Sequence, residues 1–201
     1  RGQNPRMLDR QTNDRIRALP CWSGDIEIAP LVGGITNRNF RVADQSGQRF
    51  VVRLGRDIPE HGVLRFNELA AARAAHAAGL SPEVVLAGAG FLVSRFIDGR
   101  TLSPDGVRDR RNLERIADLL RRCHHDIPRH LQPGPAVLFW VFQVIRNYLR
   151  LLRERDANPF GVELDALAAK NDQLEKARGP VTIVFGHNDL LADNVDVIES
   201  L

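Results

Sequence analysis

The sequence has few cysteines and no long apolar run, and these absences exclude several classes of protein. Cys21 and Cys123 are the only two cysteines and lack C-x-x-C spacing, which argues against a disulfide framework or a metal site and fits a reducing compartment. The densest apolar stretch, residues 137–152, carries two arginines and is too short to span a bilayer. The N-terminal residues are polar and contain no apolar signal segment. We therefore expect a cytoplasmic protein with no membrane partner.

The chain also lacks a basic block, an internal repeat and a low-complexity tract. Its formal net charge is +3, but the lysines and arginines are spread along the sequence and are not interleaved with aromatic residues, so we expect no nucleic-acid partner. Hydrophobic residues make up 43% and charged residues 26% of the 201 residues, which is typical of a folded chain with a proper core. The only methionine is Met7, and a natural start there would make residues 1–6 an upstream remnant.

The first half of the chain predicts short strands, and the first three of them form a meander of antiparallel strands. Strand patterns cover five segments, residues 26–28, 40–43, 49–54, 83–86 and 91–97. A glycine-containing loop, residues 31–39, lies between the first two. Its backbone N–H groups could approach a phosphate closely. A plain Gly-Gly turn is the alternative interpretation.

The third strand and the helix after it carry a cation and a carboxylate. Alternation puts Val51 and Arg53 on one face of the strand, where a small residue could lie over a nucleotide base and a cation could reach its phosphates. An alanine-rich helix is predicted over residues 63–78, with Glu68 in its first half. A strand cation followed by a helix glutamate is the ion-pair order of kinases. The alternative is two solvated surface charges.

The arrangement of elements predicts an α+β fold in two lobes. Residues 1–19 form an N-terminal extension with a short helix, and residues 20–97 form a sheet lobe with one helix. Residues 98–201 form a mainly helical lobe, with helices predicted near 113–124, 138–152 and 162–177. The linker between the lobes, around Phe96 and Ile97, is where backbone groups could hydrogen-bond to a nucleotide base.

A polar loop near the C-terminal end carries the most specific motif. The apolar residues 181–185 predict a buried strand, which leads through His187 to Asp189 and, five residues later, Asn194. This is the spacing of the kinase catalytic loop H-R-D-x-x-x-x-N, in which the Asp accepts the proton of the attacking hydroxyl and the Asn holds a magnesium ion. An Asx-rich turn is the alternative.

Taken together, these segments resemble the choline/ethanolamine kinase branch of the aminoglycoside-phosphotransferase-like, protein-kinase-like family. The resemblance rests on residues 33–40 (GGITNRNF), 50–53 (FVVR), 67–68 (NE), 96–102 (FIDGRTL) and 186–191 (GHNDLL). It implies a kinase that uses ATP and Mg²⁺ to phosphorylate a hydroxyl of choline, ethanolamine or a similar amino alcohol. The implied roles are Asp189 as catalytic base, Asn194 as magnesium ligand, Arg53 on the ATP phosphates with Glu68 orienting it, and, around the nucleotide, Gly34, Thr36, Asn37, Val51, Phe96 and Ile97.

The sequence departs from the family pattern after Asn194. The family has a second metal-binding aspartate on a strand after the catalytic loop, whereas Asp196 follows Asn194 too closely for a strand to intervene. We therefore expect a truncated helical lobe that lacks part of the acceptor pocket. A non-catalytic nucleotide-binding fragment stays open as an alternative function, as does an aminoglycoside- or thiamine-type phosphotransferase. The acceptor and the oligomeric state are not fixed by the sequence.

Overall fold

The computed structural model describes residues 8–31, 37–158, 161–188 and 196–197. Of residues 196 and 197 only the backbone is described. The chain divides into two compact units. The first comprises Arg1–Asp57, Leu64–Pro133 and Val184–Leu201, and the second comprises Ile58–Val63 and Gly134–Ile183. The expected lobe boundary at residues 97–98 lies within the first unit and stays a prediction.

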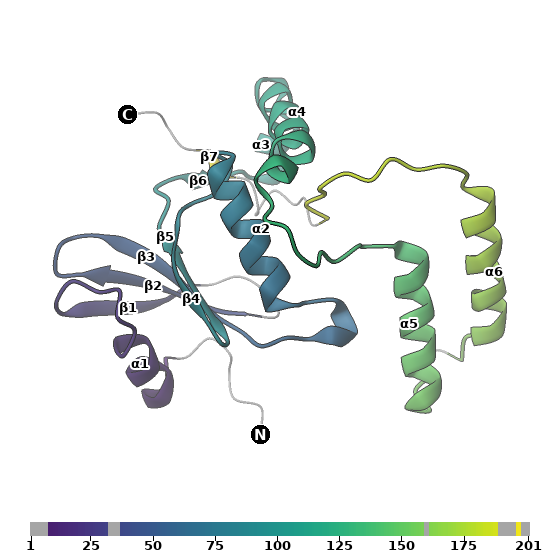
Figure 1. The fold of residues 1–201 in the computed structure, drawn as a ribbon, viewed down its shortest axis with the longest axis horizontal. Coiled ribbons are helices and arrows are strands. Elements are labelled where there is room, and N and C mark those ends of the chain that lie inside the picture. The colour runs from purple at the N-terminus through teal and green to yellow at the C-terminus, as the bar shows by residue number, and fades with distance from the viewer. Residues whose placement is uncertain (1–7, 32–36, 159–160, 189–195, 198–201) are drawn as a thin grey trace. The chain divides into compact units, whose positions relative to one another are not determined.

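The first unit contains a five-stranded sheet in which every neighbouring pair is antiparallel (Figure 1). The strand order is β1-β2-β3-β5-β4, with β1 at Ile26–Leu31, β2 at Arg38–Asp44, β3 at Arg49–Leu54, β4 at Val84–Gly88 and β5 at Phe91–Arg95. The turn between β2 and β3 is stabilised by Asp44, whose Oδ1 accepts hydrogen bonds from the backbone N–H groups of Ser46 and Gln48 at 3.0 and 3.1 Å. The predicted meander of the first three strands is confirmed.

One face of the sheet forms the main core. Phe40 pairs with Val52, and Val52 with Val93, so period-two alternation brings these side chains together. All three are buried, and the helix α1, Arg10–Arg17, covers them through its fully buried Ile16. Asp9 begins this helix by accepting a hydrogen bond from the backbone N–H of Thr12 at 2.8 Å. Arg53 is therefore on the face turned away from α1.

Helix α2, Arg65–Ala77, joins the sheet to a second group of helices in the same unit. These are α3 at Pro104–Arg108, α4 at Arg110–His125 and the 3-10 helix η2 at Ile127–His130. Ala74 of α2 packs in one buried cluster with Cys123 and Ile127, and Arg122 Nη2 donates to the carbonyl oxygen of Ala78 at 3.0 Å. The alanine-rich sequence of α2 allows this close approach because its side chains are short.

A short strand pair forms a second, two-stranded sheet. Arg100–Thr101, β6, pairs antiparallel with Asp196–Val197, β7. Asp196 is thus itself part of a strand. Its side chain is outside the described part of the structure, and it receives no role here.

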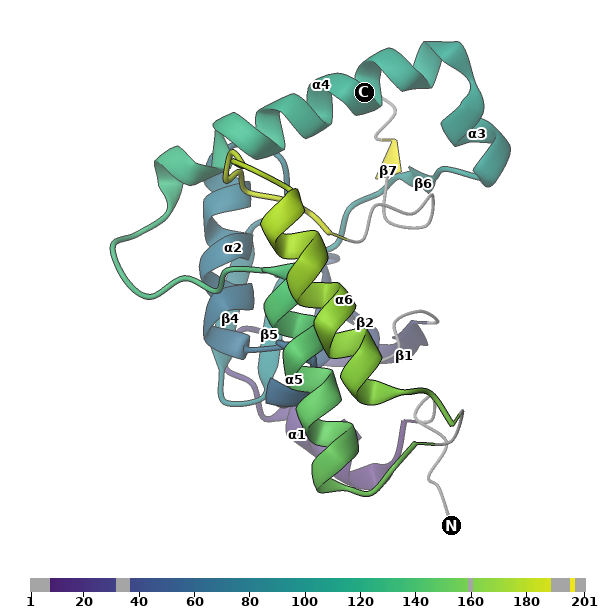
Figure 2. The ribbon, with the colours of Figure 1, turned by 90° about the vertical axis from the view of Figure 1, so that its right-hand side faces the viewer.

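The second unit is a pair of helices with the short 3-10 helix η1, Pro59–His61. Helices α5, Val141–Glu154, and α6, Leu164–Ala177, lie side by side (Figures 1 and 2). Arg146 of α5 pairs with Asp172 of α6 at 2.9 Å and also with Glu175. The predicted helices near residues 113–124, 138–152 and 162–177 correspond to α4, α5 and α6. The helix predictions are therefore confirmed, apart from shifts at the ends.

The prediction of a buried strand over residues 181–185 is wrong. The segment has no regular secondary structure, and Ile183 is 72% exposed. No strand among the described residues pairs with it. An apolar run without a neighbouring strand lacks the regular backbone partners that a strand needs, so no strand forms. Across the described residues, no helix is both long enough and apolar enough to cross a membrane.

Candidate phosphate-binding site

Arg53 of β3 and Glu68 of α2 form the predicted ion pair. Arg53 Nη1 donates to Glu68 Oε1 at 2.7 Å. Arg53 is half exposed, with 42% of its side chain accessible, whereas Glu68 is only 21% exposed. The carboxylate is therefore shielded, while part of the Arg53 side chain remains open to a ligand.

A second arginine shares the same carboxylate. Arg65, one turn before Glu68 on α2, donates from Nη1 to Glu68 Oε2 at 2.6 Å. Burial raises the pKa of Glu68, but hydrogen bonds from Arg65 and from Arg53 together outweigh burial and hold it below its usual value. Glu68 is thus ionised at neutral pH. Two guanidinium groups and one carboxylate leave a net positive charge, which suits an anionic ligand.

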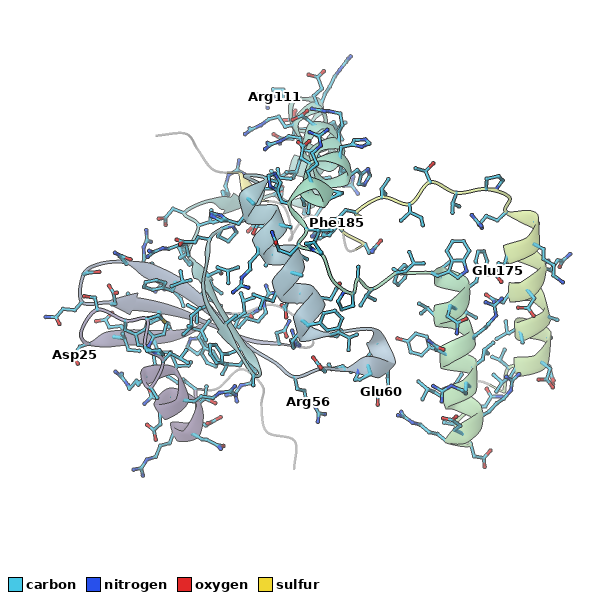
Figure 3. The ribbon with its side chains drawn as sticks, viewed as in Figure 1. Asp25, Arg56, Glu60, Arg111, Glu175 and Phe185 are labelled. Carbon is cyan, nitrogen blue, oxygen red and sulfur yellow. The ribbon has the colours of Figure 1, made fainter. Side chains whose placement is uncertain are left out.

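The loop after β3 fixes the start of α2. The backbone N–H of Arg65 donates to Asp57 Oδ1 at 2.8 Å, and Arg65 Nε donates to the carbonyl oxygen of Arg56 at 3.0 Å. Figure 3 labels Arg56 in this loop. Asp57 satisfies one of the unpaired N–H groups that every helix start exposes, although it is distant in sequence from the cap position. The loop and the helix are therefore held together at the place where Arg53 meets Glu68.

Gly55 lies in close contact with two polar side chains, with no room for a side chain of its own. A Cβ added to Gly55 would lie 2.5 Å from Asn37 Oδ1 and 2.6 Å from Arg65 Nη2. Those two atoms and Arg53 Nε are buried and have no hydrogen-bond partner among the described residues. Buried polar groups are normally satisfied, so this cluster fits a ligand or water that supplies the missing partners. The structure thus brings Asn37 beside the cationic pair.

A cavity of about 220 Å³ opens at the same place. This volume is below the roughly 300–1,000 Å³ of a typical small-molecule pocket, so the described part of the site accommodates part of a ligand. The residues that line the cavity are Arg53, Gly55, Arg65, Phe66, Glu68, Leu69, Ala87, Gly88, Phe91 and Leu92. Its charged end is formed by the Arg53–Glu68–Arg65 group.

The residues predicted to bind the nucleotide base lie in two places, one on β3 and the other just after β5. Val51 pairs with Ser94 of β5 and is half-buried, on the same face as Arg53. Phe96 and Ile97 follow β5 in an irregular linker. The N–H of Phe96 donates to the carbonyl oxygen of Arg49 at 3.0 Å, so this group is already used. The carbonyl oxygen of Phe96 and the backbone of Ile97 are the groups left to test for base binding.

Several predicted site residues lie outside the described residues, and no position is given for them. These are Gly34, Thr36, Asp189 and Asn194. The approach to the catalytic motif is described: Cys123 Sγ contacts the carbonyl oxygen of Phe185 at 3.6 Å, and Asn188 has φ 59. Figure 3 labels Phe185 at this point. Asn is one of the few residues that tolerates the left-handed region, so the residue before Asp189 turns the chain sharply.

Arg65, Gly55 and Asp57 were not identified from the sequence. Arg65 had a usable signal, since a residue three positions before Glu68 lies on the same side of a helix. Gly55 and Asp57 had none, because their roles depend on contacts across the fold. Among the described residues, no group of three or more His, Cys, Asp or Glu side chains could hold a metal ion.

The comparisons with known proteins agree on one family. The family model described as choline/ethanolamine kinase matches residues 28–199. A probable ethanolamine kinase of Arabidopsis thaliana is 27% identical over 175 residues, which covers 81% of this chain and 46% of the relative. The chain therefore spans about half the length of this curated relative.

Solved structures of small-molecule kinases have the same fold. An ethanolamine kinase of Plasmodium vivax gives a TM-score of 0.67 at 21% identity, over 86% of this chain and 52% of that one. A choline kinase of Streptococcus pneumoniae gives 0.67 at 23% identity, over 92% and 62%. A macrolide 2'-phosphotransferase gives 0.52 at 16% identity, over 94% and 68%. The α+β fold is thus of the protein-kinase-like type.

Proposed function

The chain belongs to the choline/ethanolamine kinase family, and on this basis we propose that the whole protein transfers the γ-phosphoryl group of ATP to the hydroxyl of an amino alcohol such as choline or ethanolamine. The observation that carries the proposal is the half-exposed Arg53, held 2.7 Å from Glu68 beside unpartnered buried donors. Such a cluster matches the charge and hydrogen-bonding needs of a polyphosphate.

In this proposal, one group of residues binds the nucleotide and another carries out the proton transfer. Arg53 binds phosphate oxygens, Glu68 orients Arg53, and the side chain of Asn37 contacts the same phosphates together with the backbone near Gly34 and Thr36. This charge is set in place before the reaction, so it stabilises the negative charge that the transferring group carries. Val51 packs against the base, and the linker at Phe96 and Ile97 hydrogen-bonds to it.

Proton transfer belongs to the loop that follows Phe185. Asp189 accepts the proton of the acceptor hydroxyl as this oxygen attacks the phosphorus, and Asn194 is the proposed magnesium ligand. Mg²⁺, when bound, neutralises charge on the phosphates. We also place the protein in the cytoplasm, which is supported by its two free cysteines.

A turnover assay tests the proposal. The whole protein is incubated with ATP, Mg²⁺ and either choline or ethanolamine, with thiamine and an aminoglycoside as contrasting acceptors, and ADP release is measured. We expect acceptor-dependent turnover with an amino alcohol, which Asp189→Ala lowers by at least 10²-fold, in line with the loss of a general base. Turnover that survives Asp189→Ala contradicts the assigned base, and preference for thiamine or the aminoglycoside contradicts the acceptor class.

Nucleotide binding without transfer is the second candidate function. It is favoured by the composition of the described site, in which Arg53, Arg65 and Asn37 are all suited to phosphate and none is a base. Binding of ATP by calorimetry, with no ADP release for any acceptor, would support this candidate. Failure to bind ATP at all would exclude both.

A further inference from the structure

We propose that Arg65 is a positioning residue of the phosphate site, which acts on Arg53 through their shared partner Glu68. The proposal rests on the proposed function, because it concerns how the same site binds the nucleotide. Arg65 occupies the first position of α2 and is mostly buried, with 18% of its side chain exposed.

The geometry of Glu68 is the first support. Arg65 Nη1 occupies Oε2 at 2.6 Å, and Arg53 Nη1 occupies Oε1 at 2.7 Å. A carboxylate can otherwise accept two parallel hydrogen bonds from one guanidinium. Because Arg65 holds one of the oxygens, Glu68 takes only one N–H group of Arg53. The remaining N–H groups of Arg53 stay available for phosphate oxygens.

The second support is the way in which Arg65 itself is held. Its Nε donates to the carbonyl oxygen of Arg56 at 3.0 Å, and its backbone N–H donates to Asp57 at 2.8 Å. These contacts fix the guanidinium to the loop after β3, which is continuous with the strand that carries Arg53. Arg65 is thus bonded both to Glu68 and to the loop that follows Arg53, and in this way it sets the position of Glu68 relative to Arg53.

The third support is the unpartnered group beside Gly55. Arg65 Nη2 is buried without a hydrogen-bond partner among the described residues, as is Asn37 Oδ1 close by. A group held only for stability would have its donors satisfied by the protein. In the proposal, ordered water supplies the missing partner of Arg65 Nη2, so Arg65 acts on the nucleotide only through Glu68.

Binding of a non-hydrolysable ATP analogue with Mg²⁺, measured by calorimetry, tests the proposal. We expect Arg65→Ala to weaken binding by about tenfold, the effect of losing roughly one charge-assisted hydrogen bond. Arg65→Lys should recover part of the loss, because a lysine can bond to Glu68 Oε2 but cannot keep the fork to the carbonyl of Arg56. Arg73→Ala is the matched control, since Arg73 is exposed on the same helix, and it should leave binding unchanged.

A double-mutant cycle separates positioning from general stabilisation. In a Glu68→Ala background, Arg65→Ala should weaken binding by less than about twofold, since the shared partner is already gone. An undiminished tenfold loss in that background overturns the proposal. If turnover is measurable, Arg65→Ala should raise KM for ATP more than it lowers kcat, because Arg65 does not contact the acceptor.

The result also distinguishes this inference from the proposed function. Binding by the parent chain that Arg65→Ala leaves unchanged overturns the role of Arg65 alone. No binding by the parent chain overturns both. Circular dichroism and thermal unfolding of each variant identify a loss of binding that follows from unfolding, and a loss that tracks the melting temperature alone counts against positioning.

Discussion

Gly55 is a residue where a single added atom would disturb the polar end of the site. It separates Asn37 Oδ1 from Arg65 Nη2, and both atoms lie within 2.6 Å of the place a Cβ would take. These neighbours are the ends of side chains, which can move at modest cost. A substitution at Gly55 therefore acts on the arrangement of the site more than on the fold.

We predict that Gly55→Ala weakens binding of the ATP analogue by about three- to tenfold, while the free energy of unfolding falls by only about 1 kcal/mol. The methyl group displaces Asn37 and Arg65 without changing any charge. Calorimetry and urea unfolding measure the two effects on the same protein. Unchanged binding in a fully folded variant would show that the close contact at Gly55 has no part in nucleotide binding.

Only some residues of the site could be predicted from local sequence patterns. Period two identified Val51 and Arg53 as neighbours on one face, and the order of strand and helix identified Glu68. Helical spacing would also have identified Arg65. Only the tertiary structure could identify Asp57 and Gly55, because a loop residue that caps a later helix and a glycine beside a distant side chain leave no periodic signal.

At the scale of elements, α2 connects the ion pair to the helices that follow the sheet. Its first turn carries Arg65 and Glu68, and Ala74 near its other end is 1% exposed against Cys123 and Ile127. Packing at one end of the helix therefore helps to fix the charges at the other.

We predict that Ala74→Leu destabilises the protein by about 1–3 kcal/mol, because a close-packed contact has no room for three more carbon atoms. Ala77→Leu on the same helix is the matched control, since Ala77 is exposed, and its effect should stay within about 0.5 kcal/mol. Thermal or urea unfolding measures both. Equal effects of the two substitutions would contradict the packing of α2 against α4 and η2.

The segment before the catalytic motif shows the opposite case. Residues 181–185 have the composition of a buried strand but are irregular. Apolar composition favours burial and extended structure in general, but a strand also needs a neighbour with free backbone groups. The sequence pattern shows the apolar composition, but it does not show whether a neighbouring strand is present.

At the scale of the whole molecule, the chain consists of two units that differ in their internal support. The first has a five-stranded sheet with a buried core, whereas the second is a helix pair and one short turn whose large side chains include several exposed ones, among them Leu138, Tyr148 and Leu174. Few buried apolar contacts mean low local stability. We therefore expect local opening to concentrate in the second unit.

Limited proteolysis with trypsin checks this expectation. Arg178 lies exposed just after α6, and Arg41 lies exposed in the middle of β2. We predict that cleavage after Arg178 precedes cleavage after Arg41 by at least tenfold in rate, since a protease needs an extended, unpaired backbone and β2 is paired on both sides. Mass spectrometry of the early fragments identifies the sites. Equal rates at the two arginines would contradict the assigned difference in local stability.

The sequence by itself determined several main elements: the alternation of β2 and β3, the alanine-rich α2 and the amphipathic helices, together with the spacing of Asp189 and Asn194. Local periodicity is enough for these, because each depends on neighbours within a few residues. The tertiary structure decided that Glu68 is shared by two arginines, that Gly55 leaves unsatisfied polar atoms beside them, and that residues 181–185 form no strand. These features depend on contacts between segments far apart in the chain, and such contacts follow from packing and backbone pairing across the fold.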